Sequence, residues 1–107
     1  MEVIIVLCTF PTRECARQIG TQLVEKQLVA CMNLLPKMES IYQWGGEVQQ
    51  DEEYLAIMKT SRRRYDQLEA VLKELHPYEN AEIIYTGVDG GAEAYLNWVR
   101  DITEGNH

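Results

Sequence analysis

The stretch EVIIVLCTF, residues 2–10, decides how this fold is built. It is dominated by β-branched and other apolar residues, which favour a β-strand. Both alternating sets of its side chains are apolar, with Ile4, Val6 and Cys8 on one side and Val3, Ile5 and Leu7 on the other. That pattern is typical of a central strand covered on both faces. The stretch therefore predicts a sheet with one face under helices and a second face that also needs a cover.

Helical and extended patterns alternate along the rest of the chain. Pro11 stops the first strand, and Thr12 is a suitable N-cap for the amphipathic helix that follows. Gly45-Gly46 is a two-residue hairpin signal between two extended stretches. In chain order, the predicted elements are a strand at 2–10, a helix from 12 to about 28, strands at 30–44 and 47–60, a helix capped by Thr60 or Ser61 and ended by Pro77, a strand at 82–88 and a helix at 92–103.

The element order is βαββαβ with an additional C-terminal helix. Right-handed crossovers make the two strands of each βαβ unit parallel, with one strand inserted between them. The predicted fold is a ferredoxin-like α+β sandwich, in which four antiparallel strands take the spatial order 4-1-3-2 and helices cover one face. The 107 residues predict a single domain over 1–107, with a long hairpin between the second and third strands.

The second sheet face and the long hairpin both indicate self-association. The strand at 47–60 carries Tyr54, Ala56 and Met58 on one side and Leu55 and Ile57 on the other. Both of its faces are therefore apolar, and an apolar face of this size marks an interface. The stretch 30–44 spans about 50 Å at roughly 3.3 Å per residue, more than a small sheet pairs. Pro36 marks a bulge or an edge within it. Pairing its exposed edges with a neighbouring subunit would satisfy them.

Composition excludes several classes of protein. A net charge of -7 repels phosphate backbones, so we expect no nucleic-acid partner. No apolar run approaches the roughly 20 residues of a membrane span, and the N-terminus lacks the features of a signal peptide. The cysteines at positions 8, 15 and 31 form no CxxC pair, so we expect reduced thiols and a cytoplasmic location. No catalytic motif is present, so we expect no enzyme activity.

Six motifs together resemble the CutA family, the divalent-cation tolerance proteins. They occur in family order over nearly the whole chain: VLCTFPT, LVEKQLVACMNLLP, SIYQWGGEV, DEEYLAIMKT, LHPYENAEII and AYLNWV. The resemblance implies a ferredoxin-like fold, a homotrimer and a role in tolerance to copper and other divalent cations. It also implies an architecture similar to that of the nitrogen-regulatory PII proteins.

The resemblance further implies a copper site made of a cysteine late in the first strand and two histidines before Pro-Tyr. Carried over, the cysteine is Cys8 and the second histidine is His76, whereas Leu75 takes the place of the first. Thiolate with imidazole suits Cu(I) or zinc. The alternative for His76, one of two histidines with His107, is a residue at a helix C-terminus. The alternative for Cys8 is a small buried apolar side chain.

Other polar and aromatic residues occupy family motif positions and predict a polar pocket between subunits: Tyr42, Trp44, Lys59, Tyr78, Glu79 and Glu82. Lys59 lies late in an apolar strand, where an ammonium group needs a partner. Glu79 or Glu82 could supply a carboxylate from the same or a neighbouring subunit. The alternative to a functional pocket is an interface salt bridge.

Two other functions stay open beside metal tolerance. One is a PII-like regulatory module that binds a small anion or a nucleotide in clefts between subunits. The other is a trimeric scaffold that anchors another protein. Metal titration distinguishes the first function from these two, and a nucleotide thermal-shift screen tests the regulatory module.

Overall fold

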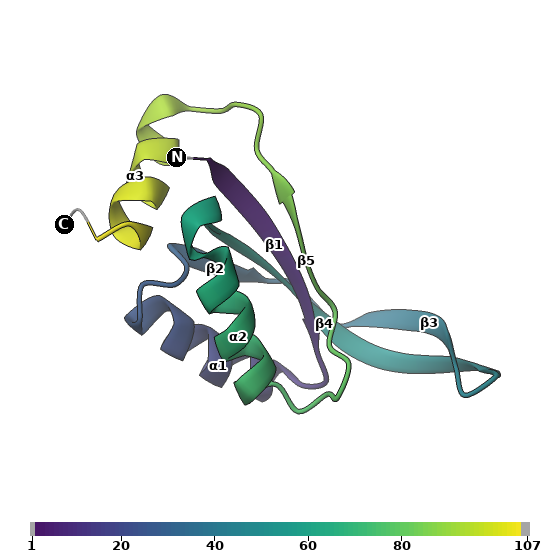
Figure 1. Ribbon diagram of the computed structural model, residues 1–107. Helices are drawn as coiled ribbons and strands as arrows, with labels where there is room; N and C mark the ends of the chain where they lie inside the picture. Colours follow the sequence, from purple (N-terminus) through teal and green to yellow (C-terminus); the bar gives the residue numbers. More distant parts are fainter. Residues whose placement is uncertain (1, 106–107) are drawn as a thin grey trace.

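The computed structural model describes residues 2–105, so His107 lies outside the described residues. Figure 1 shows its elements: β1 (Val3–Phe10), α1 (Arg13–Glu25), β2 (Cys31–Leu34), β3 (Met38–Trp44), β4 (Glu47–Ser61), the 3-10 turn η1 (Arg62–Arg64), α2 (Tyr65–Leu75), β5 (Ile83–Gly87) and α3 (Glu93–Thr103). None of the helices within this part of the chain is long and apolar enough to cross a membrane.

The sheet has the predicted topology. Its strands pair in the order β2-β4-β1-β5, and β3 pairs with β4 beyond the end of β2. All of these pairs are antiparallel. Because β2 and β3 together form the predicted second strand, this order confirms the ferredoxin-like sandwich. Cys8 lies opposite Ala56 on β4 and Ile83 on β5, so the end of β1, the start of β5 and the base of the hairpin share one end of the sheet.

The extended stretch predicted at 30–44 is divided into two strands. Leu34 pairs with Ala56 and Met38 pairs with Glu53, so the three residues 35–37 oppose two residues on β4. One extra residue on one strand is a β-bulge, which bends the strand that carries it. Pro36 lies inside the bulge, where its missing N–H costs no ladder hydrogen bond. The prediction of a bulge or an edge at this proline is confirmed as a bulge.

Helix α1 begins as predicted and ends earlier. The Thr12 hydroxyl accepts a hydrogen bond from the Cys15 N–H at 3.0 Å, which confirms the N-cap. The helix ends at Glu25 because Gln27 takes a left-handed conformation with φ of 60°. The N–H of Leu28 then bonds to the Leu23 carbonyl at 3.0 Å, as in a Schellman motif. Leu28 is therefore buried beyond the helix rather than within it.

The main core lies between one sheet face and the helices α1 and α2. It takes alternate residues of β1 and β4 together with apolar residues of both helices, among them Ile4, Val6, Phe10, Met58, Leu23, Leu68 and Leu72. This confirms the predicted sidedness of β1.

Helix α3 forms a second, smaller core that the sequence did not predict. Val99 of this helix is buried with Val3 and Ala30, and Val3 alternates with the residues of β1 that face the main core. The Thr103 hydroxyl also donates to the Ser61 hydroxyl at 3.1 Å. In Figure 1, α3 lies beside the start of β1, apart from the layer of α1 and α2. The C-terminal helix thus covers one end of the second sheet face.

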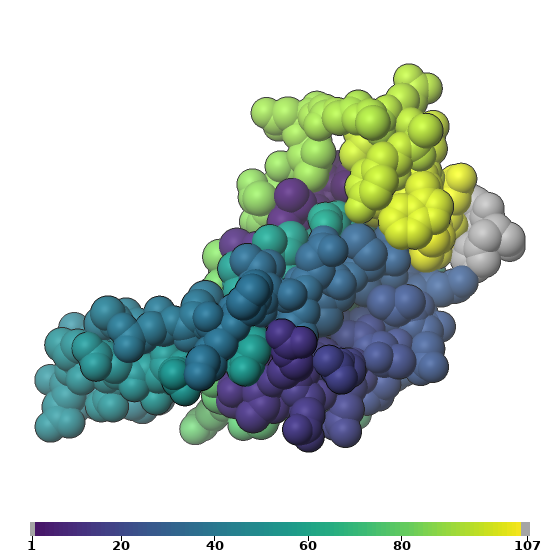
Figure 2. Space-filling model, turned by 180° about the vertical axis from the view of Figure 1, so that it is seen from behind, coloured from purple at the N-terminus to yellow at the C-terminus, as the bar shows by residue number. Residues whose placement is uncertain are grey.

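The rest of the second face and the hairpin stay open in a single chain. Ile5, Leu7, Leu55 and Ile57 are only partly buried, and Ile84 of β5 is 55 % exposed. The hairpin projects from the body, as Figure 2 shows, and the molecule measures 46 × 25 × 23 Å.

The hairpin turn has the predicted form. Gly45 and Gly46 have φ values of 63° and 80°, the positive angles that a tight two-residue hairpin turn favours. Near this turn, Trp44 is 59 % exposed and Val48 72 % exposed. Both apolar side chains are therefore without a cover in one chain.

Candidate functional site

The candidate site lies at the end of the sheet where β1 ends and β5 begins. His76 directly follows α2 and is its C-cap, with an extended backbone and its N–H bonded to the Leu72 carbonyl at 2.8 Å. The loop from Pro77 to Glu82 then leads into β5. The helix-end placement predicted for His76 is confirmed, but the side chain turns inward and is 7 % exposed.

Both ring nitrogens of His76 are engaged. The Tyr78 N–H donates to Nδ1 at 3.1 Å, and Nε2 lies 2.7 Å from the Thr9 carbonyl oxygen. Because a backbone N–H only donates, Nδ1 must accept, and Nε2 then carries the proton that it donates to Thr9. The ring stacks on Phe10, with centroids 4.8 Å apart and planes 20° apart. These contacts place the donated ring proton on Nε2 and leave neither ring nitrogen without a partner.

Cys8 is buried next to the same carbonyl. Its side chain is fully buried, and its Sγ lies 3.8 Å from the Thr9 oxygen, to which the thiol donates. Burial, and then the negative charge of Glu82, raises the pKa of Cys8 to about 12. The thiol is therefore protonated at neutral pH. Cys8 and His76 lie near one another, as the topology predicts, because both side chains donate to the carbonyl oxygen of Thr9.

Two tyrosines hold carboxylates at the base of the hairpin. The Tyr78 hydroxyl donates to Glu53 at 2.8 Å, and Glu53 is only 8 % exposed. On the hairpin itself, the Tyr42 hydroxyl donates to Asp51. Burial, and then the bond to Glu53, raises the pKa of Tyr78, so this phenol stays a neutral donor.

Of the other predicted pocket residues, Lys59 and Trp44 lie away from this end, and Glu79 and Glu82 lie at it in the loop before β5. Lys59 lies opposite Ile5 and Cys31, three residues along β4 from the partner of Cys8, and its ammonium group donates to Asn33. Trp44 lies at the hairpin tip. Glu79 and Glu82 are exposed in the loop before β5. The predicted six-residue pocket between subunits stays a prediction.

Within one subunit, neither Cys8 nor His76 has an atom that is free to bind a metal ion. A metal ligand needs a thiolate or a free nitrogen lone pair, whereas Cys8 is protonated and both nitrogens of His76 are engaged. Across residues 2–105, no group of three or more His, Cys, Asp or Glu side chains is placed to hold a metal ion. These residues do not fit a copper ion in this arrangement, so the metal role of both stays a prediction from the resemblance.

Two groups of this site were not predicted from the sequence, namely the side chain of Glu53 and the backbone carbonyl of Thr9. Glu53 belongs to an acidic run that the sequence presents as a solvated face, yet its side chain is buried and accepts a hydrogen bond from Tyr78. The Thr9 carbonyl is a backbone group and leaves no sequence signal.

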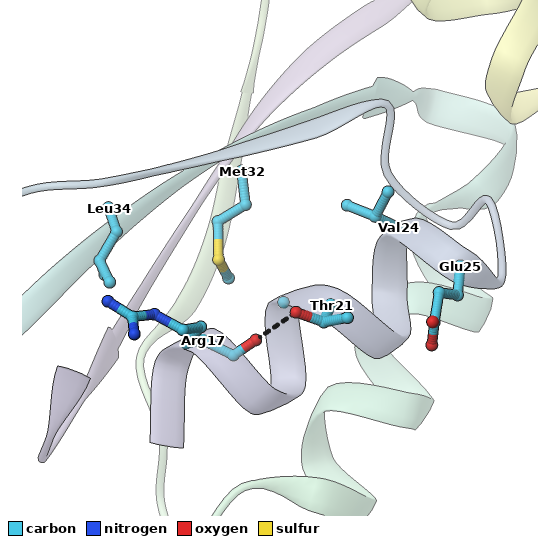
Figure 3. Close-up of a pocket in the computed structure, with 7 residues that line it drawn as sticks. Arg17, Thr21, Val24, Glu25, Met32 and Leu34 are labelled. Carbon is cyan, nitrogen blue, oxygen red and sulfur yellow. Dashed lines mark hydrogen bonds between the residues drawn. The ribbon is translucent and has the colours of Figure 1, made fainter. Parts of the chain in front are cut away.

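Two hollows flank helix α1 on the surface. One, of about 320 Å³, lies between α1 and β2. Figure 3 shows Val24, Met32 and Leu34 around it, with the Thr21 hydroxyl bonded to the Arg17 carbonyl at 2.8 Å. The other, of about 520 Å³, lies between the start of α1 and the hairpin base, and its lining includes Arg13, Arg17 and Lys37.

Comparison with known proteins shows one family. The family model described as "CutA1 divalent ion tolerance protein" matches residues 4–102. A divalent-cation tolerance protein CutA from Thermus thermophilus is 42% identical over 99 residues, which are 92% of this chain and 96% of that protein. The human protein CutA is also 42% identical, over 90% of this chain, which spans 54% of the human protein.

Solved structures agree with the sequence matches. The divalent cation tolerance protein (Cut A1) of Thermus thermophilus superposes with a TM-score of 0.92 at 42% identity and covers 94% of this chain, which in turn covers 98% of it. CutA1 from Oryza sativa gives a TM-score of 0.94 at 35% identity, with coverages of 96% and 94%. The chain therefore belongs to the CutA1 divalent ion tolerance family.

Proposed function

We propose that this chain acts in divalent-cation tolerance as a cytoplasmic homotrimer that catalyses no reaction. The observation that carries the proposal is the half-covered second face of the sheet. Helix α3 covers only the end around Val3, whereas Ile5, Leu7, Leu55 and Ile57 are partly exposed. Burying apolar surface contributes about 25 cal/mol per Å², so this face favours contact with further copies of the chain.

The projecting hairpin supports the same assembly. Its apolar side chains Ile41, Trp44 and Val48 are 62 %, 59 % and 72 % exposed, and it extends beyond the part of the sheet that α1 and α2 cover (Figure 1). A neighbouring subunit would cover these side chains and the open edge of β3. The free thiols Cys8, Cys15 and Cys31 suit a reducing compartment such as the cytoplasm.

Copper is the cation that we propose to test first. The resemblance to the family implies tolerance to copper, and this implication is independent of the Cys8–His76 pair. The net charge of -7 also favours cations near the surface. Since the pair presents no free ligand within one subunit, the tolerance role is proposed independently of that pair.

Growth of metal-sensitive cells that lack their own protein of this family tests the proposal. Cells that express this chain should grow at copper, zinc or cobalt concentrations that stop the parent cells. Cells that express Ile5→Asp, which disrupts the apolar face, should not. Growth equal to that of cells with an empty vector would contradict the tolerance role.

A second candidate function is the PII-like module that binds a small anion or nucleotide. It is favoured by the larger of the two hollows beside α1, whose lining includes Arg13, Arg17 and Lys37 together with Glu14 and Glu52, the last of which is paired with Lys37 at 3.1 Å. A thermal-shift screen with ATP, ADP and inorganic phosphate tests it, because a bound ligand stabilises by mass action. A shift that is lost in Arg17→Ala supports this function, and no shift with any of the three contradicts it.

A further inference from the structure

The carbonyl oxygen of Thr9 accepts from two side chains. The imidazole Nε2 of His76 donates to it at 2.7 Å, and the thiol of Cys8 approaches it at 3.8 Å. Thr9 itself is 5 % exposed, so its carbonyl would be costly to leave without a donor. The histidine therefore supplies a hydrogen bond that the end of β1 needs.

The other nitrogen of the ring continues the same connection. Nδ1 accepts the N–H of Tyr78, and the hydroxyl of Tyr78 donates to the buried Glu53 on β4. The His76 ring also lies between Phe10 and Tyr78, with centroids 4.8 and 4.9 Å away. One continuous set of contacts thus joins the end of β1, the loop before β5 and the base of the hairpin.

We propose that Cys8 and His76 are not metal ligands in this protein, and that His76 is the centre of a hydrogen-bonded latch. The latch consists of the bonds from His76 to Thr9, from the Tyr78 N–H to His76 and from the Tyr78 hydroxyl to Glu53. It holds the loop 77–82 against the end of β1 and the base of the hairpin. This inference goes beyond the proposed function and does not depend on it.

Metal binding and the latch exclude each other at these atoms. Coordination through Nε2 would remove the proton that bonds to Thr9, and coordination through Nδ1 would displace the Tyr78 N–H. Coordination by Cys8 would require a thiolate in a fully buried position. Leu75, which packs against the main core, leaves no second imidazole to offset these losses.

The test compares His76→Ala, His76→Asn and Cys8→Ala in the full-length assembled protein. The side-chain carbonyl of asparagine can accept from the N–H two residues later, so Asn restores the Tyr78 contact without an imidazole. Glu79→Ala, in the same loop and exposed, is the matched control. If His76→Ala fails to assemble, Tyr78→Phe tests the outer half of the latch by removing its bond to Glu53.

Two measurements decide the outcome. Hydrogen exchange reports the Tyr78 amide, which the latch predicts to exchange about tenfold faster or more in His76→Ala and near the wild-type rate in His76→Asn. In the Tyr78→Phe arm, the amides of loop 77–82 should exchange faster than in Glu79→Ala. Chelator competition with Cu(I) under reducing conditions should give the same affinity, or no binding, in all of these proteins.

Two results would overturn the latch. The first is an unchanged Tyr78 amide in His76→Ala. The second is a fall of about tenfold or more in Cu(I) affinity in both His76 variants and in Cys8→Ala, which would make both residues ligands. Because neither measurement depends on cell growth, a failed latch can be told apart from a failed tolerance role.

Discussion

At the scale of single residues, burial decides the chemistry of this end of the sheet. Cys8, His76 and Glu53 are the types of residue that bind metals, yet each is less than a tenth exposed. Burial favours the neutral thiol, and hydrogen bonds hold the imidazole and the carboxylate. The same residue types at the surface would be open ligands.

Tyr78→Phe should destabilise the protein by about 1–3 kcal/mol, because Glu53 would lose its phenol donor while remaining buried. Tyr42→Phe is the matched control, since its partner Asp51 is exposed and water can replace the phenol. Chemical denaturation of both variants measures the difference. Equal losses of stability would show that the burial of Glu53 does not increase the cost of losing its phenol donor.

The raised pKa of Cys8 predicts a pH dependence of stability. The folded thiol keeps its proton to about pH 12, whereas the unfolded thiol loses it near pH 9. The folded state therefore binds more protons between these values, and its stability should fall as pH rises through that window, by up to about 1.4 kcal/mol per pH unit. Cys8→Ala should show a shallower fall than Cys31→Ala in denaturation at pH 9 and 10.5. Equal slopes would mean that Cys8 does not resist ionisation.

At the scale of elements, the hairpin and α3 shape the surface around the central sheet. The bulge at residues 35–37 lets the hairpin leave the sheet, and α3 covers one end of the second face. Both therefore determine which apolar surface a single chain leaves uncovered.

Trp44→Ala should lower the stability of the assembly more than Gln22→Ala does. The reason is that Trp44 is 59 % exposed in one chain and is placed at the tip of a projecting hairpin, where a neighbouring subunit would bury it. Thermal unfolding at several protein concentrations measures the effect. Equal melting temperatures for the two variants would count against a hairpin contact.

Much of the fold could be predicted from the sequence because alternation is a local signal. The two faces of β1, the Gly45-Gly46 turn and the break at Pro36 all follow from residues close in sequence. The position of α3 and the burial of Glu53 could not be predicted in this way. Both depend on contacts between segments far apart in the chain, and the hydrogen bonds of His76 depend on a backbone carbonyl that has no sequence signal.

At the scale of the whole molecule, one chain leaves its sheet half covered. Helices α1 and α2 cover one face, and α3 covers only part of the other. Charge at the uncovered part should therefore be tolerated in a monomer and costly in an assembly.

Leu55→Asp should dissociate the assembly, because it buries an unpaired carboxylate in the contact between subunits. Gln18→Ala, at an exposed position of α1, is the control and should assemble normally. Sedimentation of both variants measures the change. An assembly of Leu55→Asp that equals that of the control would place the interface elsewhere.

Light scattering of the wild-type protein at micromolar concentration tests the central claim most directly. If three copies cover the second sheet face and the hairpins, the measured mass should be three times that of one chain and should stay so on dilution through that range. A mass equal to that of a single chain would contradict the account.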